Sequence, residues 1–426
     1  MDPAAVSVRG MGATVTRIGA RITPSVGVAV VGGGPAGLAA SSRLADCGCS
    51  HVVLERERIA WSWQSQRWDS FRLNTPRWAN RVPGEYLDGE PGSFASAPAL
   101  VSALERLAEG LPVVEGAEVR SARPAGGGWR LDTSYGPLTA GAVVVASGFQ
   151  NVPRRPGYAH ALPAEIRQLH VADYRRPGDV EDGVLVVGGG QSGVQIADEL
   201  LEAGKRVYLS TSRVGRLPRR YLGRDSMEWM RESGQLDLPA EQADPPTLGA
   251  TPPQVSGVGG GRTLSYQHLA SRGATLLGHA VGYDRHRFEL APDLGENIRF
   301  ADEASAFFRA AWEKRAQVSS RTFAAAAQPD PADDPAPGLH HVRGPESLDL
   351  ADAGVSTVIW ATGFGPSIGW LPRGALDSRR RPQLPGLHVI GAQWLTHRSS
   401  ANLYGMAADA ERLAGSLANV CVRAAA

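Results

Sequence analysis

The sequence predicts an α/β protein in which one strand–turn–helix unit occurs twice. Both units show the same order of β-branched run, glycine-rich turn and Ala/Leu-rich helical pattern: residues 26–31, 32–37 and 38–45, and again 184–187, 188–193 and 194–201. A further β-branched run follows each helix, at Val52–Glu55 and at Arg206–Ser210. Strands that alternate with helices in this way form parallel sheets covered by helices.

Length and charge limit the function. The chain has 426 residues, which suggests two or three domains. With a net charge of +1, it has no broad electrostatic field of the kind that attracts nucleic acid or an acidic membrane surface. Apolar residues make up 42% and charged residues 20%, values typical of a globular enzyme with an ample core.

Cysteines and apolar runs bear on the compartment. Cys47, Cys49 and Cys421 are too few for a disulfide framework and form no Cys-x-x-Cys pair, so we expect a reducing cytoplasm. No apolar run reaches the ~18–20 residues that span a bilayer. Residues 1–26 have no continuous apolar core, so we expect a loosely ordered tail rather than a secretory signal.

The glycines in each turn have a physical role. In G-x-G-x-x-G the first glycine turns the chain out of the strand, the second admits a pyrophosphate and the third lets the helix pack on the strand. Phosphates then lie at the helix N-terminus, where free N–H groups favour negative charge. The sequence therefore predicts two Rossmann-like dinucleotide sites, whose residues are Gly32, Gly34, Pro35, Ala36 and Gly37 in the first and Gly188, Gly190, Gln191, Ser192 and Gly193 in the second.

The residue after each second strand distinguishes the two ligands. Glu55 can accept hydrogen bonds from a ribose diol, which favours FAD in the first unit. The second unit has no carboxylate there, and Arg213, helped by Arg206 or Arg216, can pair with the 2′-phosphate of NADPH. The alternative for Arg213 is a solvated surface arginine.

Taken together, these motifs resemble the flavin-containing monooxygenases. The two glycine turns and the late Ala361-Thr362-Gly363 look like that family's FAD fingerprint, NADPH fingerprint and C-terminal ATG motif. The stretch Trp63–Pro83 is similar to a bacterial branch of the family. The resemblance runs from about Val28 to the C-terminal helix.

Two departures from the family pattern stand out. Only Trp63 remains of its Gly-Gly-x-Trp sequence. Its signature F-x-G-x-x-x-H-x-x-x-[FY]-[KR] keeps only its second half, from His170 onward, because Ala164 and Ile166 replace Phe and Gly. These departures weaken the expectation of a typical N- or S-oxygenating member and leave the flavin expectation intact.

The resemblance assigns further roles. Asn74 matches an asparagine near the reactive edge of the flavin, where its amide could bind a peroxide or the nicotinamide. The alternative is that Asn74 caps the turn before Pro76. The tryptophans of this region could wall the flavin or substrate cavity or could pack the core: Trp61, Trp63, Trp68 and Trp78. We expect Trp63 to contact the flavin and the other three to pack the core. His170 is expected to be structural, and His340-His341 has no metal-ligand context.

The function implied by the resemblance is an NADPH-dependent FAD monooxygenase. NADPH reduces the flavin, O2 forms a C4a-(hydro)peroxyflavin, and one oxygen atom enters a small organic substrate by N- or S-oxygenation or a Baeyer–Villiger reaction. The absence of Cys-x-x-Cys excludes a thioredoxin-reductase-like route. Two alternatives stay open: an NADPH oxidase or reductase that oxygenates nothing, and a non-catalytic redox-sensing flavoprotein. A homodimer is compatible with the sequence.

The expected domain order follows from the motifs. We expect a tail, an FAD domain in two segments and an inserted NADPH domain, at residues 1–26, 27–150 with 340–426, and 151–339. The stretch after Pro218, with Gly223–Arg231 and the Pro/Gly-rich loop 239–261, is the expected substrate lid, because function often lies on such loops.

Overall fold

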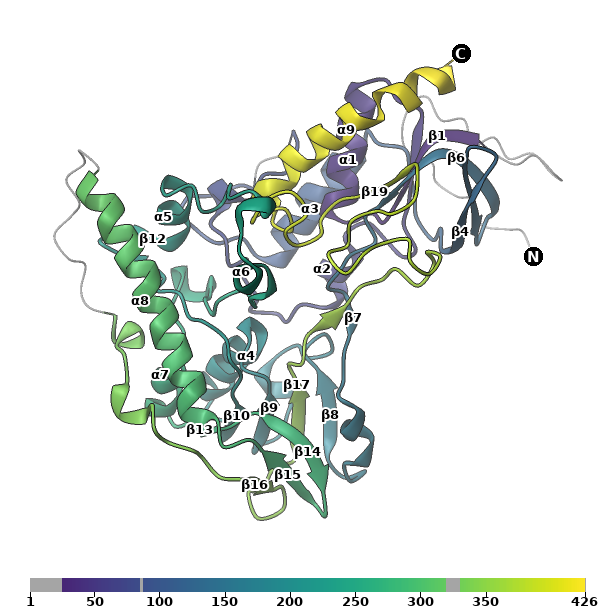
Figure 1. Cartoon of the computed structure of the whole chain (residues 1–426). Helices are drawn as coiled ribbons and strands as arrows, with labels where there is room; N and C mark the ends of the chain where they lie inside the picture. Colours follow the sequence, from purple (N-terminus) through teal and green to yellow (C-terminus); the bar gives the residue numbers. More distant parts are fainter. Residues whose placement is uncertain (1–24, 85–86, 319–329, 426) are drawn as a thin grey trace.

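The computed structural model describes residues 25–84, 87–318 and 330–425. Two sheets rich in parallel strands lie at opposite ends of the molecule (Figure 1). Between them lies a region of short helices and loops, flanked by the long helix α8 (Leu294–Val318). The predicted α/β class with two Rossmann-like sheets is confirmed.

The first sheet is centred on the first predicted strand. Its order is β3-β2-β1-β6-β5-β4, and β19 pairs with β6. Its strands are β1 Ser25–Val31, β2 His51–Leu54, β3 Val113–Val114, β4 Val119–Ala125, β5 Gly128–Thr133, β6 Gly136–Val145 and β19 Leu387–Val389. Strand β1 pairs in parallel with both β2 and β6, and residues 27–31 are all buried. Burial on both faces explains why this strand is apolar throughout rather than alternating.

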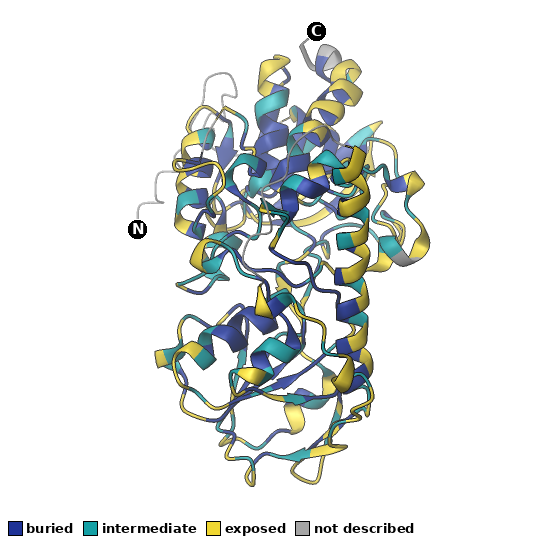
Figure 2. Ribbon diagram, turned by 90° about the vertical axis from the view of Figure 1, so that its left-hand side faces the viewer, coloured by how far each residue is buried: buried dark blue, intermediate teal, exposed yellow. Residues whose placement is uncertain are grey.

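Helices cover one face of this sheet. They are α1 Pro35–Asp46, α3 Ala97–Ala108 and α9 Leu403–Ala425, with the short α2 Trp61–Ser65 near α3. Leucines of α1 and α9 share one core with the valines of β1. The other face carries a second core that includes Trp129, Phe149 and Trp370. Figure 2 shows this buried interior and the exposed outer surface of the helices.

A disulfide joins Cys49, in the turn before β2, to Cys421 in α9. The two residues are 372 positions apart, so no spacing signal in the sequence could reveal the pair. The bond ties the last helix to the first βα unit, and Cys47 stays free and exposed. Cysteine usage therefore does not support the expected reducing environment.

The second sheet repeats the parallel arrangement. Its order is β13-β10-β9-β17-β8, and its strands are β8 Arg167–His170, β9 Val184–Val187, β10 Val207–Ser210, β13 Thr275–Leu277 and β17 Thr357–Trp360. Helices α4 Gln191–Glu202 and α7 Tyr266–Ser271 pack against it. An antiparallel sheet, β14 Ala280–Asp284, β15 Arg287–Leu290 and β16 Ser347–Asp349, lies beside it.

The boundary expected at residues 339/340 does not coincide with the division between the sheets. Strand β17 pairs in parallel with β9 and with β8, so it belongs to the second sheet and not to the first. The chain crosses between the sheets through β7 Val152–Pro153 and β18 Phe364–Gly365, which pair antiparallel. The apolar sequence of β17 would fit the centre of either sheet. Its pairing with β8 and β9 is what places it in the second sheet.

The region between the sheets has its own core. It contains β11 Arg220–Tyr221, β12 Arg224–Asp225, α5 Ser226–Glu232 and α6 Pro245–Gly249. Residues of α5 and α8, among them Trp229 and Trp312, pack together there. The predicted amphipathic face at 307–312 is present in α8, where Phe308 and Trp312 are buried and Phe307 is exposed. Figure 2 shows the outer side of this helix exposed along its length.

Single-turn helices complete the description. They are η1 Arg77–Ala79, η2 Gly157–Ala161, η3 Pro177–Asp179, η4 Ala240–Gln242, η5 Val258–Gly260, η6 Pro331–Asp333 and η7 Pro337–Leu339. No helix within the described residues is both long and apolar enough to span a bilayer. The expected N-terminal tail lies outside those residues, apart from positions 25 and 26.

Candidate cofactor and substrate site

One cavity of about 1020 Å³ is lined by residues of both βα units. Gly32, Gly34, Pro35 and Ala36 reach it from the first unit. Gln191, Ser192 and Arg213 reach it from the second, together with Gln195 of α4. This volume is at the upper end of the range of small-molecule and cofactor sites.

In the first glycine turn, two glycines are closely packed against the protein and the middle one borders open space. A Cβ atom on Gly32, where φ is +115°, would lie 2.3 Å from the Ala146 carbonyl oxygen. One on Gly37 would lie 1.9 Å from the Gly32 carbonyl oxygen. A Cβ on Gly34 would meet no atom within 4 Å. Gly32 and Gly37 are therefore needed for the turn and the helix contact, whereas Gly34 leaves open space at the start of α1.

Glu55 lies directly beside this turn. Its carboxylate accepts hydrogen bonds from the backbone N–H groups of Gly33 (2.6 Å) and Glu57 (2.9 Å). Burial raises the pKa of Glu55, while these two hydrogen bonds oppose the rise. The side chain is held at the cavity wall, in the position that the fingerprint requires of a ribose acceptor.

The second glycine turn has matching geometry. Cβ atoms on Gly188 and Gly193 would lie 2.5 Å from the Ala361 carbonyl oxygen and 1.8 Å from the Gly188 carbonyl oxygen. A Cβ on Gly190 would meet nothing within 4 Å. Both turns thus leave space at their middle glycine, immediately before a helix N-terminus.

The Ala361-Thr362-Gly363 motif lies beside the second turn. Ala361 contacts the positions of Gly188 and Gly193, and the Thr362 hydroxyl donates to the Arg154 carbonyl oxygen (2.6 Å). We expected this motif in the FAD domain. It lies at the second turn instead, because it directly follows β17, which belongs to the second sheet. The counterpart at the first turn is Ala146-Ser147-Gly148 after β6, which lines the cavity. Sequence reasoning missed it, although an apolar strand followed by Ala-Ser-Gly was the available signal.

Among the three candidate arginines, the structure singles out Arg213. Arg206 directly precedes β10, and its guanidinium donates to the Gly354 carbonyl oxygen. Arg216 is fully buried in ion pairs. Arg213 is exposed at the cavity, with its Cζ 4.8 Å from the Phe300 ring centroid. Among the described residues it has no carboxylate partner, so its guanidinium is free to meet a phosphate.

Replacing Arg213 tests whether its guanidinium binds the 2′-phosphate of NADPH. We expect Arg213→Ala to raise KM for NADPH about 10–100-fold and to leave KM for NADH nearly unchanged, because only NADPH loses a charged hydrogen bond. Steady-state kinetics with both nucleotides measures the ratio. Arg206→Ala is the matched control and should not change nucleotide preference. Equal effects on NADPH and NADH in Arg213→Ala would contradict the assignment.

Asn74 connects the two units. Its amide nitrogen donates to Gln191 (3.2 Å), and its amide oxygen accepts from Gln195 (3.2 Å). Its backbone carbonyl oxygen accepts from Arg219 (2.8 Å). Asn74 also lines the cavity, and its hydrogen bond to Gln191 places it directly at the N-terminus of α4.

The tryptophans near the first βα unit lie only partly where we expected them. Trp63 lines the cavity, and the Arg67 Cζ lies 4.6 Å from its ring centroid and 5.5 Å from that of Phe71. Trp61 and Trp68 also line the cavity, whereas they were expected only to pack the core. Burial lowers the pKa of Arg67 to about 10, and no carboxylate in the described residues pairs with it.

The sequence did not predict that the cavity wall would hold several arginines without a carboxylate partner. Besides Arg213, the cavity wall holds Arg67, Arg380 and Arg398, none with a carboxylate partner in the described part of the chain. Burial lowers the pKa of Arg380 and of Arg398. Arginine is abundant in this chain, so the sequence offered no way to distinguish these positions.

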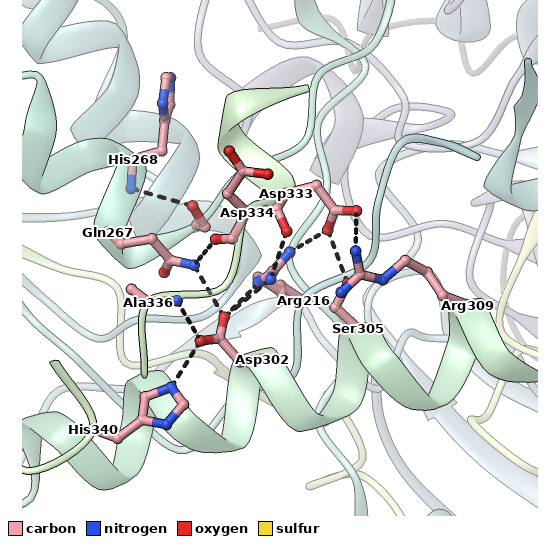
Figure 3. Close-up of polar contacts among 11 residues, drawn as sticks. Arg216, Gln267, His268, Asp302, Ser305, Arg309, Asp333, Asp334, Ala336 and His340 are labelled. Atoms are coloured by element: carbon pink, nitrogen blue, oxygen red, sulfur yellow. Dashed lines mark hydrogen bonds and ion pairs between the residues drawn. The ribbon is translucent and has the colours of Figure 1, made fainter. Parts of the chain in front are cut away.

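A polar network fixes the position of α8 along the cavity (Figure 3). The buried Arg216 guanidinium pairs with Asp302 of α8 (3.0 Å) and with Asp333. The Asp302 carboxylate also accepts from His340 (2.8 Å) and from the Ala336 N–H (2.9 Å). Burial would raise the pKa of Asp302, but these hydrogen bonds and the Arg216 charge outweigh it and lower the value. The network therefore accounts for Arg216 and His340 as structural residues.

His170, which we expected from the sequence to be structural, also makes its contacts within the protein. His170 is fully buried, its Nε2 lies 3.1 Å from the Gly363 carbonyl oxygen, and its Nδ1 accepts from the Ala172 N–H. Within residues 25–84, 87–318 and 330–425, no cluster of His, Cys, Asp or Glu could hold a metal ion.

Known proteins share this architecture. Residues 29–221 match the pyridine nucleotide-disulphide oxidoreductase family. An uncharacterized oxidoreductase described as CzcO-like, from Geobacillus kaustophilus (strain HTA426), is 29% identical over 92% of this chain and 99% of its own length. An indole-3-pyruvate monooxygenase of rice is 32% identical over 46% of this chain and 50% of its own length.

Solved structures agree on the fold. The flavin-containing monooxygenase from Stenotrophomonas maltophilia superposes with a TM-score of 0.62 at 19% identity, over 94% of this chain and all of that one. The chain therefore has the fold of the flavin-containing monooxygenases over almost its whole length.

Proposed function

We propose that this enzyme is an NADPH-dependent FAD monooxygenase that oxygenates a small organic substrate. The observation that carries the proposal is that the first glycine turn and the start of α4, through Gln191 and Ser192, line one cavity. Asn74 is hydrogen-bonded there to Gln191, the first residue of α4. A cavity shared by two dinucleotide sites allows a nicotinamide to meet a flavin.

The residues present fit the two cofactors. Gly34 and Gly190 leave room for pyrophosphates at the N-termini of α1 and α4, and Glu55 suits the unphosphorylated ribose of FAD. Arg213 suits the 2′-phosphate of NADPH. Bound FAD supplies the two-electron chemistry with NADPH and the reaction with O2. The protein contributes orientation, exclusion of water and hydrogen bonds at fixed positions.

Cysteine chemistry does not compete with this proposal. A dithiol route needs a redox-active cysteine pair beside the flavin. Cys49 and Cys421 are bonded to each other at the outer end of α9, and neither lines the cavity. Electrons therefore have no dithiol acceptor at the site, and O2 is the acceptor that we propose.

Asn74 provides the test of oxygenation. We expect Asn74→Leu to keep reduction by NADPH within about 3-fold of wild type, because the glycine turns are intact. It should release at least about 3-fold more hydrogen peroxide per NADPH, because a hydrogen-bonding amide is lost at the junction of the two sites. Stopped-flow reduction and a peroxide assay measure the two quantities.

The control keeps the fold and changes a neighbouring amide. Gln254→Leu removes a buried amide that donates to the Gly189 carbonyl oxygen and does not line the cavity. It should lower stability without raising the peroxide yield. If wild type already converts all NADPH into peroxide with every amine, sulfide and ketone offered, the oxidase alternative becomes the better account.

A further inference from the structure

Arg398 lies in an apolar part of the cavity wall. Its Cζ is 5.9 Å from the ring centroids of both Phe308 and Trp394. The region between the sheets contributes further apolar side chains to the same cavity: Leu217, Met227, Met230 and Leu236. A charged group thus faces a surface that otherwise suits a hydrocarbon body.

The guanidinium of Arg398 has no counter-ion. Within the part of the chain that the structure describes, no carboxylate lies within ion-pair distance, and no hydrogen bond from the guanidinium to the protein is present. Burial lowers the pKa of Arg398 below its ordinary value. An uncompensated, partly desolvated cation is unfavourable in the free protein, and an anionic ligand group removes that penalty.

The backbone around Arg398 is held rigidly. Its N–H donates to the Leu238 carbonyl oxygen (2.9 Å), while the neighbouring His397 and Ser399 are buried. The Ser399 hydroxyl binds the Leu236 carbonyl oxygen (2.8 Å) and lies 3.1 Å from His397 Nδ1. Asp409 of α9 lies 3.5 Å from His397 Nε2. Arg398 is therefore presented from a fixed loop, as a preorganised binding group is.

The other cavity arginines lie near cofactor elements. Arg213 follows β10 beside the second glycine turn, and Arg380 stacks on Phe149 next to the first. Arg67 contacts Trp63 and Phe71. Arg398 instead contacts α8 and the loop that leads into α9. These aromatic neighbours of Arg398 suit a substrate with an apolar body better than a nucleotide phosphate.

We propose that Arg398 binds the acidic group of the substrate, and that the substrate is an organic acid whose apolar body lies against Met227, Met230 and Phe308. This inference rests on the proposed function and specifies its substrate class. The acid group would pair with the guanidinium through charge-assisted hydrogen bonds. The apolar body would then fill the remainder of this subsite and reach toward the shared cavity.

Isothermal titration calorimetry of the FAD-loaded enzyme tests the proposal with matched acids and amides. The probes are hydrocinnamate with hydrocinnamamide, and isocaproate with isocaproamide. In wild type we expect at least one acid to bind about 10-fold or more tightly than its amide, the scale of one charged hydrogen-bonded pair. Arg398→Gln should equalise acid and amide, and Arg398→Lys should retain part of the preference.

Arg373→Gln is the matched control, because it removes one exposed arginine outside the cavity. It should keep the acid preference of wild type. No preference in wild type for either pair, or a preference that survives in Arg398→Gln, would overturn the proposal. So would loss of FAD or NADPH affinity in Arg398→Gln with the acid preference unchanged. Calorimetry needs neither NADPH nor O2, so its failure is distinct from a failure of oxygenation.

Discussion

Gly34→Val is expected to give a folded protein that purifies with less than about a tenth of the wild-type FAD. The added Cβ meets no protein atom within 4 Å. The side chain would instead occupy the space at the N-terminus of α1 where we propose that the FAD pyrophosphate binds. The backbone there is also permissive, since φ is −82°. The variant therefore separates ligand binding from folding.

The measurement is flavin content by absorbance, together with circular dichroism and a thermal melt. Gly37→Val is the contrasting variant, because its Cβ would lie 1.9 Å from the Gly32 carbonyl oxygen and should disrupt the turn itself. Stoichiometric FAD in purified Gly34→Val would refute the first turn as the FAD site.

Gly190→Val is expected to keep FAD and to lose reduction by NADPH. Its Cβ also meets nothing within 4 Å, and φ is −73°, so the second turn should fold normally. The side chain would block the pyrophosphate of NADPH at the N-terminus of α4. We expect the rate of flavin reduction at a fixed NADPH concentration to fall at least about 100-fold, a loss of about 2.7 kcal/mol.

Anaerobic stopped-flow mixing with NADPH measures this rate. Dithionite, which needs no nucleotide site, should reduce the variant as it reduces wild type. The two variants thus form a reciprocal pair, in which one loses FAD and the other loses only NADPH. A Gly190→Val enzyme reduced by NADPH at the wild-type rate would show that the second turn does not bind the nucleotide.

The sequence predicted the features that local chemistry determines. A β-branched run followed by glycines and a helix pattern requires a particular turn, and Gly32 and Gly188 both have the positive φ that this turn needs. Glu55 likewise lies beside Gly33, because the end of one parallel strand faces the turn of its neighbour. These contacts connect residues about one βα unit apart.

Features that depend on distant pairing were not predictable. The strand Thr357–Trp360 is apolar enough for either sheet, and only its pairing with β9 and β8 places it in the second. The Cys49–Cys421 bond joins opposite ends of the chain. Arg216 and Arg213 look alike in sequence, yet one is buried between two aspartates and the other is exposed at the cavity. What separates them is the tertiary position of Asp302 and Asp333.

Turnover under isotopically labelled molecular oxygen tests the central claim most directly. The enzyme is supplied with NADPH and a panel containing a sulfide, a tertiary amine, a ketone and organic acids that carry these groups. A monooxygenase places one labelled atom in the product and the other in water for each NADPH oxidised. We predict labelled product with little hydrogen peroxide for at least one substrate. Oxidation of NADPH that yields only hydrogen peroxide, with no label in any organic product, would contradict this account.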